Sequence, residues 1–161
     1  MRTSFSLLCL TCLALGGCGK GPTVEERALL QIFSGLVAAQ TYDEVCNKTD
    51  PKSRYDMKDQ GNVNEFGNMQ LLAGRIGTTR HQRFPQESAA DSVKWLTAFH
   101  DNVQQRTRSS LEKKGCKSSD TQKDRKVLEK FRTTPPATLN GIIDEQIRQQ
   151  GASPLPPDAA K

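Results

Sequence analysis

Apolar residues recur at helical spacing along most of the chain, and this pattern constrains the fold more than any other feature of the sequence. Residues at positions i, i+3, i+4 and i+7 share one face of an α-helix. The two clearest stripes are Leu29, Ile32, Phe33, Leu36, Val37 and Ala39, and then Val93, Leu96, Phe99 or His100, Val103, Thr107 and Leu111. No run alternates with period two between turn signals, so the sequence predicts an all-α bundle of four to five helices.

The first helix has clear end signals. Thr23 and Glu26 form a capping box, in which each side chain is expected to satisfy a backbone N–H of the other. The helical period carries the apolar stripe to Cys46, and Pro51 ends the helix. Residues 51–61 are predicted to form a loop or a single loose turn.

The second helix is predicted to start at Asn62 and to end before a connection at residues 78–85. Its expected inward residues are Phe66, Met69, Leu72, Ala73 and Ile76, and its interior glycines are Gly67, Gly74 and Gly77. Each interior glycine costs up to about 1 kcal/mol relative to alanine. Either tertiary packing compensates this cost, or close approach to another backbone explains the glycines.

Three further helices follow. The third is the longest, begins after Ser88 or Asp91 and ends at Gly115. The fourth spans about residues 119–132, and the fifth opens with Thr134 as N-cap and Pro135 as first helical residue. The residues that these last two helices should bury are Val127, Leu128 and Phe131, then Leu139, Ile142, Ile143 and Ile147.

The N-terminus is typical of an exported protein. Arg2 precedes an apolar run from Phe5 to Leu15 of about eleven residues, which is well short of the ~20 that span a bilayer. The run ends in Leu-Gly-Gly-Cys18, which resembles the lipobox of bacterial lipoproteins. The resemblance implies cleavage before Cys18 and acylation of this residue, so the membrane is a partner through the N-terminal lipid.

These signals divide the chain into four parts. They are a lipoprotein signal peptide (1–17), a lipidated tether (18–22), a helical domain (23–151) and a disordered Pro-rich tail (152–161). Gly19, rather than aspartate, follows the lipidated cysteine, which by analogy with enteric lipoproteins favours the outer over the inner membrane. The expected location is therefore the periplasmic face of the outer membrane.

Two cysteines remain for the exported domain. Cys9 and Cys12 leave with the signal peptide and Cys18 carries lipid, so Cys46 and Cys116 form an even pair in an oxidising compartment. We expect one disulfide, which closes a loop of 71 residues. A metal or redox pair is the weaker alternative, because the mature chain has no Cys-x-x-Cys and no histidine near either cysteine.

The charge pattern argues against a nucleic-acid partner. The chain after residue 17 carries 22 Lys and Arg against 18 Asp and Glu, a net charge of +4, but acids and bases alternate almost everywhere. One local cluster consists of Arg75, Arg80 and Arg83. These arginines are candidates to contact anionic head groups or the acidic surface of a partner.

Residues suited to catalysis are few. His100 and Asp101 are adjacent on a helix and are expected to point about 100° apart, so they do not read as a dyad. The acid pairs Glu25–Glu26 and Asp144–Glu145 lie on a capping turn and an exposed face, without the cleft that acid catalysis needs. We therefore expect no enzyme activity, no metal site and no cofactor.

The single tryptophan is the remaining candidate for a partner contact. Trp95 lies at the edge of the third helix's apolar stripe, and tryptophan is enriched at interface hot spots. The alternative, which we favour, is that Trp95 closes the core against Phe84 or Phe66.

One family resemblance combines these observations. Residues 36–42 (LVAAQTY) lead into residues 46–50 (CNKTD), and a second cysteine follows a long helix. This arrangement resembles the pilotins of type II secretion systems, which have an early cysteine disulfide-bonded to a late one. The resemblance implies that a groove of the bundle binds a helix from the C-terminal end of an outer-membrane secretin.

The sequence therefore favours a lipid-anchored periplasmic protein that binds an envelope protein and assists its assembly, with the secretin pilotin as the sharpest form. One alternative is a structural lipoprotein that contacts the cell wall or itself. Another is a cell-wall hydrolase or its inhibitor.

Overall fold

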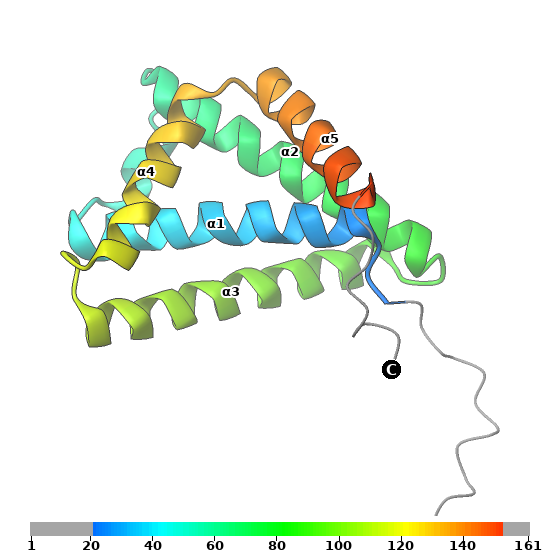
Figure 1. The fold of residues 1–161 in the computed structure, drawn as a ribbon, viewed down its shortest axis with the longest axis horizontal. Helices are drawn as coiled ribbons and strands as arrows, with labels where there is room; N and C mark the ends of the chain where they lie inside the picture. Colours follow the sequence, from blue (N-terminus) through cyan, green and yellow to red (C-terminus); the bar gives the residue numbers. More distant parts are fainter. Residues whose placement is uncertain (1–20, 153–161) are drawn as a thin grey trace, which may run out of the picture.

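The computed structural model describes residues 21–152, which form five α-helices and one short 3-10 helix without a β-strand (Figure 1). The elements are α1 (Val24–Cys46), η1 (Pro51–Tyr55), α2 (Gln60–Arg83), α3 (Ala89–Lys114), α4 (Ser119–Thr133) and α5 (Pro136–Ala152). The predicted all-α class is confirmed. The lipobox, Cys18 and the tail after Ala152 lie outside the described residues.

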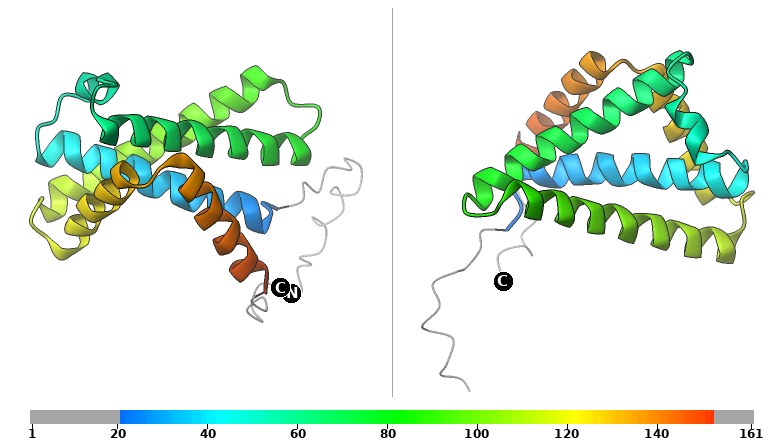
Figure 2. Two further views of the ribbon diagram at one scale, coloured as in Figure 1. Left: turned by 90° about the horizontal axis from the view of Figure 1, so that it is seen from above. Right: turned by 180° about the vertical axis from the view of Figure 1, so that it is seen from behind.

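Helix α1 is the centre of the bundle. It contacts α2, α3, α4 and α5, and the views from two sides show the other helices arranged around it (Figure 2). The core cluster comes from four of the helices and consists of Leu29, Phe33, Leu36, Val37, Leu72, Ile76, Phe131, Leu139 and Ile143. None of the described helices combines the length and apolar character needed to cross a bilayer.

The predicted disulfide is present. Cys46 and Cys116 are joined with their Cα atoms 5.6 Å apart, which links the end of α1 to the turn between α3 and α4. Gly115 ends α3 with a φ of 76°, a conformation that favours glycine. The Gln122 amide donates to the Cys116 carbonyl over 2.9 Å, so the start of α4 is fixed to the same corner.

The capping box at the start of α1 forms only in part. The Glu26 backbone N–H donates to Thr23 Oγ1 over 3.0 Å, as predicted. The Glu26 carboxylate, however, does not return to Thr23. It is fully buried, and its Oε1 atom lies 3.0 Å from Nη2 of Arg83 in α2. The carboxylate turns inward because the Arg83 guanidinium is a charged partner, whereas the backbone at the start of α1 offers only a neutral N–H. The expected reciprocal bond is wrong.

Helix α2 is longer than the sequence predicts at both ends. Asp59 rather than Asn62 is its N-cap, since the Asp59 side chain accepts from the Asn62 backbone N–H over 2.9 Å. At the other end, the helix includes most of the predicted connection at residues 78–85 and ends at Arg83. Buried Thr79 and the ion pairs made by the last two arginines compensate the helix-weakening glycines.

The three interior glycines that the sequence singled out, Gly67, Gly74 and Gly77, have different environments, and α2 also includes Gly61 in its first turn. A Cβ atom on Gly67 would lie 2.6 Å from Cγ of Pro136, the first residue of α5. At Gly74 and Gly77, a Cβ atom would meet nothing within 4 Å. Of these three glycines, only Gly67 is explained by close approach to another helix; Gly61 is approached in the same way by Arg132 of α4, whose Nε atom would lie 2.8 Å from an added Cβ atom.

Three further expectations are wrong in detail. Helix α5 begins at Pro136, one residue later than predicted. Val93 is 66% exposed because the larger Trp95, four residues before Phe99, continues the buried stripe of α3 in its place. Phe66 is 42% exposed and lines an open hollow instead of packing in the core.

Candidate functional site

The three arginines predicted to contact a partner each bind carboxylates of the chain itself. Arg75 joins three helices, with Nη2 2.7 Å from Glu25 of α1 and Nη1 2.6 Å from Asp144 of α5. Burial by itself would lower the pKa of the Arg75 guanidinium, but the hydrogen bonds to these two carboxylates outweigh it and raise the pKa. The Arg83 guanidinium is held by Glu26 and lies 4.4 Å from the centre of the Phe84 ring.

Arg80 and Trp95 are brought together at one end of α2 and α3. The Arg80 guanidinium lies 4.1 Å from the centre of the Trp95 ring and donates to Glu87 Oε1 over 2.6 Å. Trp95 also stacks on Phe99 with ring centres 5.7 Å apart. Neither Phe84 nor Phe66 is the stacking partner that the sequence suggested. Partner binding by Trp95 and the three arginines stays a prediction.

The catalytic candidates do not converge on a reaction site. His100 Nδ1 lies 3.1 Å from Asp101 Oδ1, so these neighbours approach one another more closely than their helical positions predicted. Asp101 is exposed, and the other acid pairs are divided among ion pairs with separate arginines. Among the described residues, no group of three or more His, Cys, Asp and Glu side chains could hold a metal ion.

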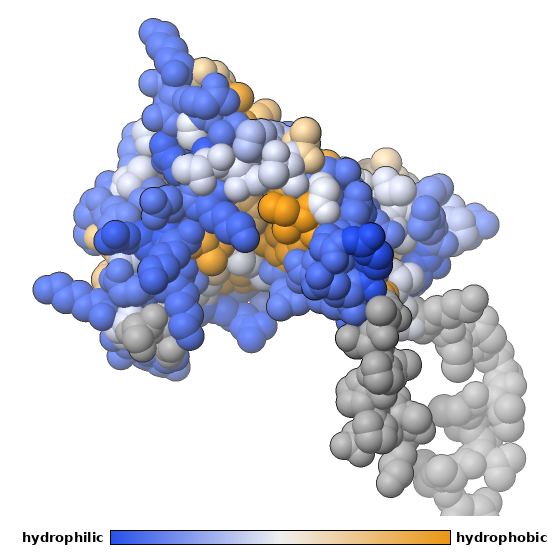
Figure 3. All heavy atoms as spheres, turned by 45° about the horizontal axis from the view of Figure 1, so that its top comes forward, coloured by the Kyte–Doolittle hydropathy of each residue, from blue (hydrophilic) through white to orange (hydrophobic). Residues whose placement is uncertain are grey.

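A hollow with a mostly apolar lining lies between α4 and α5. These two helices diverge from the short link at Thr134 and Pro135, and each packs on α1 and α2 (Figures 1 and 2). The hollow, which we call the α4–α5 groove, has a volume of about 240 Å³. Its lining consists of Ile32, Gly35, Val127, Lys130, Phe131, Thr134, Leu139, Ile142 and Gln146. Figure 3 shows apolar surface open in the middle of this face, bordered by hydrophilic side chains.

Local sequence explains why the groove stays open. Gly35 lies on its floor without a side chain, and a Cβ atom there would meet only Val127 Cγ1, at 3.9 Å. Val127 and Phe131 are four residues apart on α4, so both face the groove. Ile142 of α5, which the sequence predicted to be buried, is instead 38% exposed at the opposite rim, because the groove leaves it uncovered. The sequence reasoning missed this site, although a glycine in the middle of an otherwise strong helix was a signal for it.

The rim of the groove is basic on one side. Lys130 lines it from α4, and Lys126 is exposed one turn earlier on the same helix. The α5 rim carries the uncharged polar residue Gln146. The groove therefore offers an apolar floor beside a positively charged edge.

Fold and groove together define a class: a small, disulfide-braced helical bundle with an open apolar groove. Comparison with protein-family models, with curated proteins and with solved structures gives no match to this chain.

Proposed function

We propose that this chain is a lipid-anchored, non-enzymatic binding protein of the periplasm, and that its α4–α5 groove receives an amphipathic helix of an envelope membrane protein. A secretin pilotin is the sharpest form of this function. The observation that carries the proposal is the groove itself, with its apolar lining, glycine floor and exposed Ile142.

The dimensions of the groove suit a polypeptide helix better than a small molecule. Small-molecule sites enclose about 300–1,000 Å³ and bury most of their ligand. This groove is smaller, at about 240 Å³, and is open along one side. It has room for a few side chains, which is what one face of an amphipathic helix presents at positions i, i+3, i+4 and i+7.

The charge of the rim narrows the choice of partner helix. Lys126 and Lys130 both lie on the α4 side, whereas the α5 rim is neutral where it lines the groove. Charge complementarity at a rim increases the association rate and fixes orientation. The expected partner helix therefore carries acidic residues along one flank of its apolar face.

The lipid anchor keeps the groove near the membrane. Six residue steps separate Cys18 from Val24, where α1 begins. Because an extended chain spans at most about 3.6 Å per residue, the first residue of α1 lies within about 22 Å of the acylated cysteine. A partner helix close to the inner surface of the outer membrane is within reach of this bundle.

Filling the groove floor tests the proposal. Gly35→Leu places a side chain in the groove, whereas Gly74→Leu adds the same side chain to an exposed position of α2 with nothing within 4 Å. The two tagged variants and the wild type are extracted in detergent and purified from the cell envelope. We expect one membrane protein with an acidic-flanked amphipathic segment to accompany the wild type and Gly74→Leu, but not Gly35→Leu.

Two outcomes would contradict the proposal. The same proteins could accompany all three forms, which would show that the groove is not the contact. Alternatively, peptidoglycan fragments could be the only material retained by all three, which would favour a structural lipoprotein. As a control, the circular dichroism spectrum of each variant is recorded to check that the bundle is folded.

A further inference from the structure

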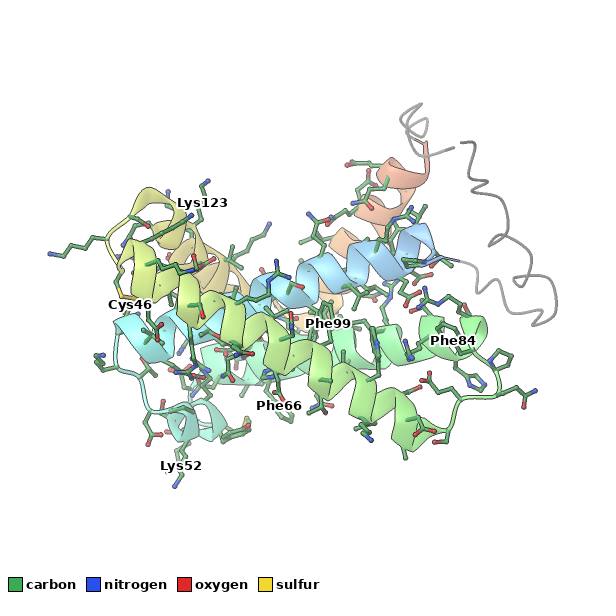
Figure 4. The ribbon with its side chains drawn as sticks, turned by 90° about the horizontal axis from the view of Figure 1, so that it is seen from below. Cys46, Lys52, Phe66, Phe84, Phe99 and Lys123 are labelled. Atoms are coloured by element: carbon green, nitrogen blue, oxygen red, sulfur yellow. A yellow bond between two sulfur atoms is a disulfide. The ribbon has the colours of Figure 1, made fainter. Side chains whose placement is uncertain are left out.

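A second hollow, on the side of α1 opposite the α4–α5 groove, differs from it in chemistry. It has a volume of about 330 Å³ and is lined from α1, η1, α2 and α3. Tyr55 and Phe66 contribute an aromatic wall, and Glu44, Glu65 and Arg54 contribute a charged one. We call this hollow the Glu65 pocket. Figure 4 shows Phe66 on its open side, between η1 and α3.

The carboxylate of Glu65 is buried without a full set of partners. This residue is 2% exposed. Its Oε1 atom accepts from the Gln40 amide over 2.7 Å, whereas Oε2 has no hydrogen-bond partner. A buried charged oxygen without a partner carries a desolvation cost that a donor from outside would relieve.

The neighbouring arginine does not supply that donor. Arg54 Nη1 donates to Glu44 Oε1 over 2.8 Å, and Nη2 donates to the Gln40 carbonyl over 2.7 Å and to Asp43 Oδ2 over 3.3 Å. Its remaining Nε atom lies 3.5 Å from Glu65 Oε1, outside hydrogen-bonding geometry. Because the guanidinium is shared among three carboxylates, it does not satisfy Glu65 Oε2.

The ion-pair cluster beside the pocket carries an excess of negative charge. It consists of the carboxylates of Asp43, Glu44 and Glu65 and the guanidiniums of Arg54 and Arg108, of which Glu44, Glu65 and Arg54 line the pocket. A cation is therefore the complementary ligand. The hollow is not a metal site, because no metal-binding group of His, Cys, Asp and Glu is found among the described residues.

The aromatic rim of the pocket favours a ligand whose charged group is carried on an aliphatic stem. Tyr55 is 68% exposed and Phe66 is also exposed, and both line the pocket. Aromatic faces attract cations and cover the methylene groups of arginine and lysine. An arginine side chain is long enough to lie along such a rim while its charged end reaches inward.

We infer that the Glu65 pocket is a second docking site, which receives an arginine side chain of a partner polypeptide, with its stem against Tyr55 and Phe66 and its guanidinium donating to Glu65 Oε2. The site is independent of the α4–α5 groove, because the only helix that lines both is α1, through different residues. An arginine of the partner bound in this pocket would be a second point of attachment, separate from the groove.

The test uses Nα-acetylarginine N-methylamide as a probe and its citrulline analogue as the neutral control. Both are titrated into the oxidised full-length protein in detergent micelles, and backbone amide shifts are followed by NMR. We expect saturable shifts with the arginine probe at Tyr55 and Phe66, and at Gln104, which lines the pocket from α3. The citrulline analogue should bind more weakly, by about tenfold or more.

Variants separate recognition from folding. Glu65→Gln should weaken arginine binding by about tenfold, whereas Glu145→Gln, on the exposed face of α5, should not change it. Tyr55→Ser removes a mostly exposed side chain, leaves the core intact and should weaken binding severalfold. Met57→Ser is its matched control, because Met57 is exposed but does not line the pocket.

Three results would overturn the inference. The first is equal binding of the arginine and citrulline probes. The second is unchanged arginine binding in folded Glu65→Gln and Tyr55→Ser. The third is tighter binding of free tetramethylammonium than of the arginine probe, which would show a site for small cations rather than for a side chain.

Discussion

Replacing three of the four glycines of α2 by alanine, one at a time, gives a quantitative test of how this helix packs. Alanine in a helix interior is more stable than glycine by about 0.5–1 kcal/mol, because glycine loses more backbone freedom on folding. This gain is common to Gly67→Ala, Gly74→Ala and Gly77→Ala. A difference among the three variants therefore reports what the added methyl group contacts.

The structure predicts opposite signs for these variants. At Gly74 and Gly77 the new methyl group meets nothing within 4 Å, so both variants should be stabilised by about 0.5–1 kcal/mol. At Gly67 it would lie 2.6 Å from Pro136 Cγ, and the rigid ring moves only if the start of α5 moves. Overpacking of this kind costs about 1–3 kcal/mol. Gly67→Ala should therefore be less stable than Gly74→Ala by about 1–3 kcal/mol.

Urea unfolding of the oxidised protein, followed by far-UV circular dichroism, measures this difference. Parallel transitions of equal slope allow the midpoints to be compared as free energies of unfolding. Equal stability of Gly67→Ala and Gly74→Ala would refute the close contact between α2 and α5. Destabilisation by Gly74→Ala would refute the assignment of open space beside that residue.

Three further predictions concern the disulfide, the anchor and pH. Cys46→Ser should lower the free energy of unfolding by about 2–5 kcal/mol, because the closed loop is long. Cys116→Ser breaks the same bond and should have the same effect. An unchanged urea midpoint in these variants would contradict the prediction. Cys18→Ser should abolish lipidation, and palmitate labelling of the serine variant would show that the lipobox interpretation is wrong. The hydrogen bond from Arg80 is the main cause that lowers the pKa of Glu87. This hydrogen bond stabilises the fold fully above the unfolded pKa of Glu87, and the stabilisation is lost as pH falls through the lowered folded pKa. Glu87→Gln should therefore be less stable than wild type near neutrality, and thermal melts across pH should show this difference shrinking in acid.

Local signals were sufficient to predict the helices and the disulfide. Thr23 and Gly115 mark helix ends as predicted, and Ser88 rather than Asp91 is the N-cap of α3, through side-chain and backbone preferences that act over a few residues. The pairing of Cys46 with Cys116 was predicted from the cysteine count, because the proposed signal peptide and lipid anchor account for the other three cysteines.

Features that depend on tertiary contact could not be predicted in this way. Glu26 turns inward because Arg83, 57 residues later in the chain, offers a buried cation. Arg83 itself lies in the last turn of α2, within the segment 78–85 that the sequence predicted as a connection. The α4–α5 groove depends on the angle between two helices, which the period of an apolar stripe does not encode. Only Gly35 hinted at it.

Site-specific photo-cross-linking at the groove rim tests the proposed function most directly. A benzoylphenylalanine in place of Ile142 lies at the groove, whereas one in place of Val93 lies on an exposed part of α3 outside it. In living cells, the probe at Ile142 should cross-link to an amphipathic helix of one envelope membrane protein, identified by mass spectrometry of the joined peptides, and the probe at Val93 should not. Identical products from both positions, or no protein product from Ile142, would contradict the proposal that this groove binds a partner helix.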